Sequence, residues 1–99
     1  MNAKNELIEF LTQKAQVKCA IIEYVPNHTT YILKINHTEE DFQNFLESLD
    51  FEYDEDYGLQ ELSGTIWLKD GTWCTRDEYD GSEWWDYKSL PEIPESCRR

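Results

Sequence analysis

Residues 64–88 read GTIWLKDGTWCTRDEYDGSEWWDYK, and this stretch decides the fold of the 99-residue chain. Two Asp-Gly pairs, at 70–71 and 80–81, separate three runs that are rich in aromatic and β-branched residues. An Asp-Gly pair between such runs is one of the strongest signals for a two-residue turn in a β-hairpin. The stretch therefore predicts a meander of three antiparallel strands. These strands are expected over 64–69, 72–79 and 82–88.

Two-residue turns would also fix which side chains share a face of the sheet, because directly opposed residues point the same way. With such turns Leu68 faces Trp73, and Arg76 faces Trp85 in a cation–π pair that supports the sheet. Both faces are then rich in apolar side chains. One face is expected to meet the helices, and the other to be covered by loops or to form an exposed aromatic surface. The first predicted face carries Ile66, Leu68, Trp73 and Trp84, and the second carries Trp67, Cys74, Arg76, Trp85 and Tyr87.

Outward from the meander, the beginning of the chain predicts a helix followed by a hairpin. Apolar residues recur at three- and four-residue steps over 5–16, which is typical of an amphipathic helix. Asn5 or the earlier Asn2 is the expected N-cap. Two short β-branched runs, 18–25 and 30–36, flank a segment with turn composition, so we expect them to pair as a β-hairpin.

A second helix is expected over 39–49, because Thr38 and Asp41 form a capping-box pattern ahead of an apolar stripe. The predicted order is α-β-β-α-β-β-β. Such an order indicates an α+β fold, with an antiparallel sheet of about five strands and both helices packed on one face. The length predicts a single domain over 1–94, followed by a flexible C-terminal tail over 95–99.

Acidic residues are concentrated in the later part of the chain. The whole chain has 21 acids and 9 bases, a formal net charge of −12. Residues 1–36 hold three acids and four bases, whereas residues 37–99 hold 18 acids and 5 bases, a net of −13. Such a charge repels nucleic acid and anionic membranes, which proteins bind chiefly through Lys and Arg. It attracts basic protein surfaces instead.

The densest acidic stretch is 50–58, DFEYDEDYG. In an extended strand alternate residues point the same way, so its rings can dock on the core while its carboxylates stand in water. Together with the acids of the second helix, this row could imitate a polyanion and occupy a groove built for phosphates; a merely solvated acidic loop is the alternative. The predicted partner-binding residues are Glu39, Glu40, Glu47, Asp50, Glu52, Tyr53, Asp54, Glu55, Asp56, Tyr57, Trp67 and Trp85, with the aromatic members as apolar anchors.

Motifs for metals, catalysis and disulfides are weak or missing. Oxygen ligands over 50–61 follow calcium-loop spacing, but Glu55 stands where such a loop requires glycine. We therefore expect no metal or other cofactor. His28 and His37 lack a motif that supplies a nucleophile, and an enzyme is not expected. Three cysteines without CxxC spacing predict reduced thiols, although a disulfide between Cys19 and Cys74 stays open.

Four short motifs in the last part of the chain carry a resemblance: GTIW at 64–67, DGTW at 70–73, EYDGSEWW at 78–85 and PEIP at 91–94. Over roughly the last 40 residues the chain resembles a family of small acidic proteins of tailed bacteriophages. No activity is established for that family, so the resemblance implies no site residues. It implies a phage protein in the cytoplasm of an infected bacterium, where small acidic phage proteins often inhibit a host enzyme or a defence system.

The sequence thus favours a non-enzymatic acidic protein that inhibits its target by binding. Its expected partner is a basic bacterial host protein, either nucleic-acid-binding or a component of a defence system. Direct binding to nucleic acid or to a membrane is not expected. The alternative is a structural or homo-oligomeric interaction module whose acidity serves only solubility, and which forms a homodimer through the aromatic face of the sheet.

Overall fold

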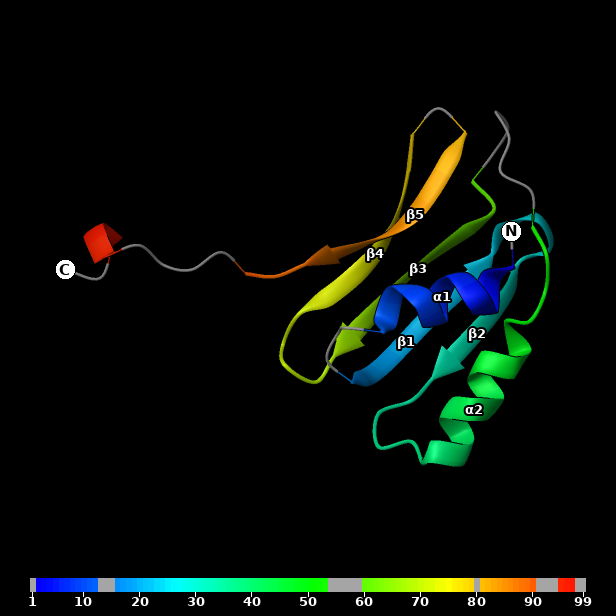
Figure 1. Ribbon diagram of the computed structural model, residues 1–99, viewed down its shortest axis with the longest axis horizontal. Helices are drawn as coiled ribbons and strands as arrows, with labels where there is room; N and C mark the ends of the chain where they lie inside the picture. Colours follow the sequence, from blue (N-terminus) through cyan, green and yellow to red (C-terminus); the bar gives the residue numbers. More distant parts are fainter. Residues whose placement is uncertain (1, 13–15, 54–59, 80, 91–94, 98–99) are drawn as a thin grey trace.

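The computed structural model describes residues 2–12, 16–53, 60–79, 81–90 and 95–97 (Figure 1). It confirms the predicted α+β fold, with two α-helices and a five-stranded antiparallel sheet. Two short 3-10 helices, η1 and η2, were not predicted. In chain order the elements are α1 (Ala3–Leu11), β1 (Val17–Tyr24), η1 (Val25–Asn27), β2 (Thr29–Leu33), α2 (Glu39–Ser48), β3 (Leu62–Leu68), β4 (Trp73–Tyr79), β5 (Ser82–Lys88) and η2 (Glu95–Cys97).

The strands lie in the order β2-β1-β3-β4-β5, so β3 is the central strand and β2 and β5 are the edges (Figure 1). The sequence predicted a hairpin and a meander separately. Antiparallel pairing of β1 with β3 joins them into one sheet, from Val17 opposite Leu68 to Tyr24 opposite Leu62. A bulge between Val17 and Cys19 interrupts this pairing.

The first hairpin of the meander has a three-residue loop, so the predicted two-residue turn at 70–71 is wrong. Trp67 pairs with Trp73. The Leu68 amide donates to the Thr72 carbonyl oxygen at 2.9 Å, and the Gly71 amide donates to the Leu68 carbonyl oxygen at 3.2 Å. The φ of Gly71 is 89°, which lies in the left-handed region. A turn followed by a left-handed glycine is the usual geometry of a three-residue hairpin loop.

Side chains alternate between the two faces along a strand. A loop one residue longer than predicted therefore puts each side chain of β3 on the opposite face, relative to the side chains of β4, from the one predicted. The second hairpin keeps its predicted register, with Arg76 opposite Trp85. The predicted assignment of Trp67 and Trp73 to different faces is therefore wrong. One face of the meander carries Ile66, Leu68, Cys74, Arg76 and Trp85, and the other carries Trp67, Trp73 and Trp84.

Both helices begin at polar caps. The Asn2 side chain accepts a hydrogen bond from the Asn5 amide, so Asn2 rather than Asn5 is the N-cap of α1. At α2 the predicted capping box is confirmed: Thr38 Oγ1 accepts from the Asp41 amide, and Asp41 Oδ2 accepts from the Thr38 amide, both at 3.0 Å. Helix α2 ends at Ser48, one residue before the predicted end.

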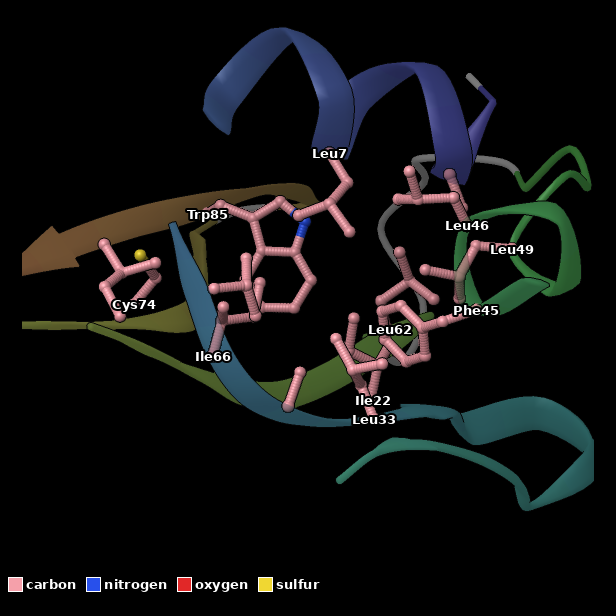
Figure 2. Packing of buried hydrophobic residues seen from close by; sticks show 14 of the residues in the cluster. Leu7, Ile22, Leu33, Phe45, Leu46, Leu49, Leu62, Ile66, Cys74 and Trp85 are labelled. Carbon is pink, nitrogen blue, oxygen red and sulfur yellow. The ribbon is translucent and has the colours of Figure 1, made fainter. Parts of the chain in front are cut away.

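The hydrophobic core lies between the two helices and one face of the sheet (Figure 2). Helix α1 contributes Leu7, and α2 contributes Phe45 and Leu46. The sheet contributes alternate residues of every strand, as expected for a face that is covered on one side. The buried apolar residues are Ala3, Leu7, Val17, Ala20, Ile22, Leu33, Phe45, Leu46, Leu49, Tyr53, Leu62, Ile66, Leu68, Cys74 and Trp85.

The cysteines are free thiols, and the disulfide between Cys19 and Cys74 that the sequence left open is not formed. The two residues lie on opposite faces of the sheet, since Cys19 pairs with Trp67 whereas Cys74 pairs with Ile66. The fold therefore keeps Cys19 and Cys74 apart. Neither of the described α-helices is long and apolar enough to cross a membrane.

Candidate acidic binding surface

Helix α2 presents three of the predicted binding carboxylates to solvent. Glu39, Glu40 and Glu47 are exposed, while Phe45 and Leu46 on the other side of the helix are buried. Glu40 and Glu47 are seven residues apart, which is two helical turns or about 10.5 Å along one stripe of the helix. The amphipathic pattern that fixes α2 to the core therefore also aims these carboxylates outward.

The segment that follows α2 continues the row. Asp50 and Glu52 are exposed, whereas Phe51 is half-buried and Tyr53 is buried. The predicted alternation of outward carboxylates and inward rings is thus confirmed over 50–53. We call Glu39, Glu40, Glu47, Asp50 and Glu52 the acidic surface.

The beginning of α1 lies against the acidic surface. Asn2 forms an antiparallel bridge with Glu52, and its Nδ2 donates to Asp50 Oδ1 at 2.9 Å and to Glu52 Oε1 at 3.4 Å. Lys4 Nζ donates to Glu47 Oε1 at 2.5 Å, and this hydrogen bond raises the pKa of Lys4 above its ordinary value. These contacts order Glu47, Asp50 and Glu52, and Lys4 neutralises part of the charge.

The predicted aromatic anchors do not join the acidic surface. Tyr53 and Trp85 are only 3% and 5% exposed, so their assignment as surface anchors is corrected: both belong to the core. Trp67 is 40% exposed, but it lies on the face of the sheet opposite the helices. The predicted combination of acids and rings in one patch is therefore separated onto two sides of the molecule. Asp54, Glu55, Asp56 and Tyr57 lie outside the described residues.

Tyr53 is held inside the protein by a buried network of charges that sequence reasoning missed. Arg76 Nη2 donates to the Tyr53 hydroxyl oxygen at 2.6 Å, and the hydroxyl donates to Glu6 Oε1 at 2.5 Å. The Arg76 side chain is fully buried and forms ion pairs with Glu6 and Glu83, each at 3.0 Å. Its guanidinium carbon also lies 5.2 Å from the centroid of the Trp85 ring, which confirms the predicted cation–π pair.

The carboxylate of Glu83 completes this network. Glu83 Oε1 accepts from Nε and Nη2 of Arg76 at 3.1 and 3.0 Å and from the Leu62 amide at 3.0 Å. Its other oxygen accepts from the Glu61 amide at 2.8 Å. Burial of charges is tolerated when they are paired and hydrogen-bonded in this way. The network therefore ties the strand β5 to the start of β3 and, through Arg76, to α1.

The pKa directions in the network follow from burial and from Glu6. Burial raises the pKa of the Tyr53 phenol, and its hydrogen bond to Glu6 raises it further. Burial alone would lower the pKa of Arg76, but the hydrogen bond and charge of Glu6 outweigh it and the pKa is raised. Tyr53 therefore stays neutral and Arg76 stays charged at ordinary pH.

One signal in the sequence could have revealed the network. Arg76 is in phase with buried Cys74 along β4, and Glu83 is in phase with buried Trp85 along β5. Two opposite charges at inward positions of paired strands predict an internal ion pair. The strand pairing predicted from the sequence assigned Arg76 only to the ring of Trp85, because Glu6 lies in α1 and Glu83 does not pair directly with Arg76.

Among the residues that the structure describes, no group of three or more His, Cys, Asp or Glu side chains could hold a metal ion. His28 Nδ1 lies 3.4 Å from a carboxylate oxygen of Glu23, and His37 Nδ1 lies 2.8 Å from the Lys34 carbonyl oxygen. The calcium-loop spacing over 50–61 falls largely outside the described residues. The expectation that the protein has no metal stays a prediction.

Comparisons of the chain with protein-family models, with curated proteins and with solved structures found no match. The resemblance of the last part of the chain to small acidic bacteriophage proteins therefore stays a prediction. The α+β class, the acidic surface and the exposed sheet face are the features from which a function can be argued.

Proposed function

We propose that this protein is a non-enzymatic binding protein whose acidic surface occupies a basic, nucleic-acid-binding surface of another protein. One observation carries the proposal. The five carboxylates of the acidic surface follow one continuous stretch of chain, from α2 into 50–53, and all five residues are exposed. Contacts from Asn2 and Lys4 order part of this row, so the partner meets a shaped anionic surface rather than a mobile tail.

The spacing of the carboxylates suits a groove built for phosphates. One strand of duplex DNA presents a negative charge about every 3.4 Å of helix axis. Glu40 and Glu47 are separated by about 10.5 Å along α2, about three such steps. Asp50 and Glu52 are alternate residues of an extended segment, about 6.7 Å apart or two such steps. A row with these intervals can replace phosphates against Lys and Arg side chains.

The resemblance to small acidic bacteriophage proteins suggests where the partner would be found. In that setting the target is a basic host protein or a component of a defence system, and binding inhibits it by excluding nucleic acid. Electrostatic attraction also speeds the encounter of an acidic protein with a basic surface. The protein would act in the cytoplasm of the infected bacterium.

Two variants with equal net charge test the proposal. Each neutralises three acids and changes the formal net charge from −12 to −9. They differ only in where the charge is removed. The acidic-surface variant contains Glu40→Gln, Glu47→Gln and Asp50→Asn, and the matched variant contains Glu9→Gln, Asp70→Asn and Glu78→Gln.

The measurement is affinity capture of basic proteins from a bacterial lysate at low salt, followed by addition of duplex DNA. We expect the wild type and the matched variant to capture a partner that DNA releases, and the acidic-surface variant to lose it. Release by DNA is the informative step, because phosphates and the acidic surface would compete for the same Lys and Arg side chains. A partner that DNA does not displace, or one that both variants bind equally, would refute the imitation of a polyanion.

A further inference from the structure

The face of the sheet opposite the helices exposes several large apolar side chains. Ile21 and Ile32 form a cross-strand pair there and are 46% and 58% exposed. Trp67 and Trp84 are 40% and 41% exposed, and Trp73 pairs with Trp67. We call this surface the open face. Its described residues in the strands are Cys19, Ile21, Glu23, Thr30, Ile32, Ser63, Thr65, Trp67, Trp73, Thr75, Asp77, Tyr79, Ser82, Trp84, Asp86 and Lys88.

An antiparallel sheet that shows one face to water normally carries polar residues on that face. Here the open face holds three of the chain's four tryptophans. A shallow groove of about 380 Å³ lies on the part of this face near β1 and β2, lined by Cys19, Ile21, Ile32, Ile35 and Trp67 among others. Contiguous exposed apolar surface of this kind marks an interaction site, and tryptophan is enriched where binding energy is concentrated.

The size of the open face matches one side of a stable protein interface. Five strands about 4.8 Å apart, each of about seven residues at about 3.3 Å, cover a projected area of about 550 Å². Protruding side chains make the accessible area larger than the projected area. A standard interface buries about 800 Å² on each partner. A dimer contact of standard size would therefore involve nearly the whole open face.

Charge favours a second copy of this chain as the occupant. Among its described strand residues, the open face holds only three of the chain's 21 acids, Glu23, Asp77 and Asp86, and Lys88 lies 3.7 Å from Asp77 and 3.3 Å from Asp86. The acidic surface lies on the other side of the sheet. Two stacked sheets lie about 10 Å apart and each helix layer adds about 10 Å, so the two acidic surfaces would lie about 30 Å apart. That is several times the Debye length of about 8 Å at physiological salt.

The two ends of the open face also complement each other. Lys88 pairs with Trp73 at one end, and Lys34 borders the groove at the same end. Ile21, Thr65 and Thr75 lie side by side across the middle of the face. Glu23 and Asp77 lie two residues from this row along their strands, toward the other end. If the strands of two copies run in opposite directions, the lysine end of each copy lies over the acidic end of the other.

We propose that this protein is a homodimer in which the open faces of two copies pack against each other around a two-fold axis. The dimer has four layers: helices, sheet, sheet, helices. Because the strands of the two copies run in opposite directions, this axis crosses the strands, and Thr65 in the middle of the central strand β3 lies close to it. This proposal does not depend on the proposed function, and each copy would keep its acidic surface on the outside.

The oligomeric mass, measured by light scattering after size-exclusion chromatography, tests the proposal with a matched pair of variants. Ile32→Lys places a charge in the open face, and Ile8→Lys places the same charge on α1, where Ile8 is 42% exposed. We expect the wild type and Ile8→Lys to have twice the chain mass of 11.8 kDa, and Ile32→Lys to have that mass once. Far-UV circular dichroism checks that both variants are folded.

Cross-linking locates the contact. In a background with Cys19→Ser and Cys97→Ser, the remaining Cys74 is fully buried. A short bismaleimide should then join two copies of Thr65→Cys, and should not join two copies of Gln43→Cys on the outer side of α2. A wild-type monomer up to about 1 mM, a dimer that survives Ile32→Lys, or cross-linking of Gln43→Cys alone would overturn the proposal. The acidic-surface variant should remain dimeric, so failure of this proposal is distinguishable from failure of the proposed function.

Discussion

Gly64 in β3 occupies a position that no other residue fits. Its φ is 150°, and a Cβ built there would lie 2.3 Å from the Ile21 carbonyl oxygen and 2.9 Å from the Ile22 Cα. Both obstacles are backbone atoms of β1, which cannot move without breaking the pairing of β1 with β3. Gly71 also has a positive φ, of 89°, but a Cβ there would meet nothing within 4 Å.

We predict that Gly64→Ala lowers the free energy of unfolding by about 3 kcal/mol or more, from overpacking and backbone strain together. Gly71→Ala should lower it by only about 1–2 kcal/mol, because strain alone acts there. Urea unfolding of both variants measures the difference. Equal losses would mean that β1 does not approach β3 as closely as the structure places it.

The buried carboxylate of Glu83 gives a second prediction at the scale of the residue. Glu83→Gln should lower the free energy of unfolding by about 3 kcal/mol, because it removes the buried charge that faces Arg76 and replaces an acceptor by a donor. Glu78 is the control, since it lies directly opposite Glu83 on β4 and is exposed. Glu78→Gln removes only a like charge and should change stability by less than about 0.5 kcal/mol.

Both variants can be compared by chemical denaturation at neutral pH. If Glu83→Gln proved as mild as Glu78→Gln, the ion pair between Arg76 and Glu83 would contribute nothing that an amide cannot supply.

The raised pKa of Tyr53 predicts a loss of stability in alkali. Burial and the hydrogen bond to Glu6 hold the pKa above its ordinary value of 10.0. A group whose pKa is higher in the folded state contributes stability below its unfolded pKa, and this contribution is lost as the pH rises above it. We expect the wild type to lose stability above about pH 10, and Tyr53→Phe to lose less.

Tyr79, which is 76% exposed, supplies the control for this measurement. Tyr79→Phe should keep the alkaline slope of the wild type in thermal unfolding between pH 8 and 11, since it removes an exposed hydroxyl and leaves the buried network around Arg76 intact. Parallel slopes for wild type and Tyr53→Phe would contradict the burial of the Tyr53 hydroxyl.

At the scale of the element, the start of α2 shows what local sequence can decide. Thr38 and Asp41 form the capping box that the spacing predicts, because both groups of the box lie within one turn of the helix. Thr38→Ala should lower the free energy of unfolding by about 1 kcal/mol. Thr30→Ala, at an exposed position of β2, is a control that removes a hydroxyl without removing a cap.

This capping prediction is checked by thermal unfolding at neutral and at acid pH. The amide of Thr38 holds the pKa of Asp41 below its ordinary value of 3.8. The stability that ionised Asp41 contributes is therefore present at neutral pH and is lost as the pH falls through the folded pKa. The Asp41→Asn variant should differ from the wild type at neutral pH and approach it in acid; a constant difference would speak against the box.

The loop between β3 and β4 shows where local sequence fails. An Asp-Gly pair fits a two-residue turn, but it equally fits a three-residue loop in which the glycine is the last, left-handed residue. The Asp70 side chain favours the latter, because it accepts from the Thr72 amide at 3.0 Å. The choice depends on which residues of β3 must face the core. Only the packing of Ile66 and Leu68 under the helices settles it, and that information is not local.

The acidic surface and the buried network show the same contrast between what local sequence predicts and what tertiary packing decides. The alternation over 50–53 was predictable, because carboxylates and rings alternate within a single segment. The network around Arg76 was not assembled from the sequence, because its members come from α1, from the segment after α2, and from β4 and β5. Local patterns predicted which side chains point inward, and tertiary packing decided which of them meet.

At the scale of the whole molecule, charge and apolar surface are placed on opposite sides. The acidic surface lies over the helices, and the open face lies on the other side of the sheet. The sequence predicted both features but assigned them to one patch. The one-residue error in the first hairpin had put Trp67 on the same face of the sheet as Trp85. Separated surfaces allow one side to bind a basic partner while the other side binds a second copy.

This separation predicts how salt affects stability. Carboxylates gathered on one side repel each other, and raising the salt from about 0.1 M to about 1 M shortens the Debye length from about 10 Å to about 3 Å. Screening should therefore raise the melting temperature of the wild type. The exposed pair of Lys4 and Glu47 acts in the opposite direction, but pairs of this kind contribute little to stability.

The two charge variants show whether this repulsion comes from the acidic surface. If it does, the acidic-surface variant should gain less from salt than the matched variant, although both have the same net charge. The measurement is the melting temperature at the two salt concentrations for the wild type and both variants. Equal gains would mean that the negative charge acts as a diffuse total and that α2 with 50–53 presents no distinct anionic surface, which would remove the physical basis for imitation of a polyanion.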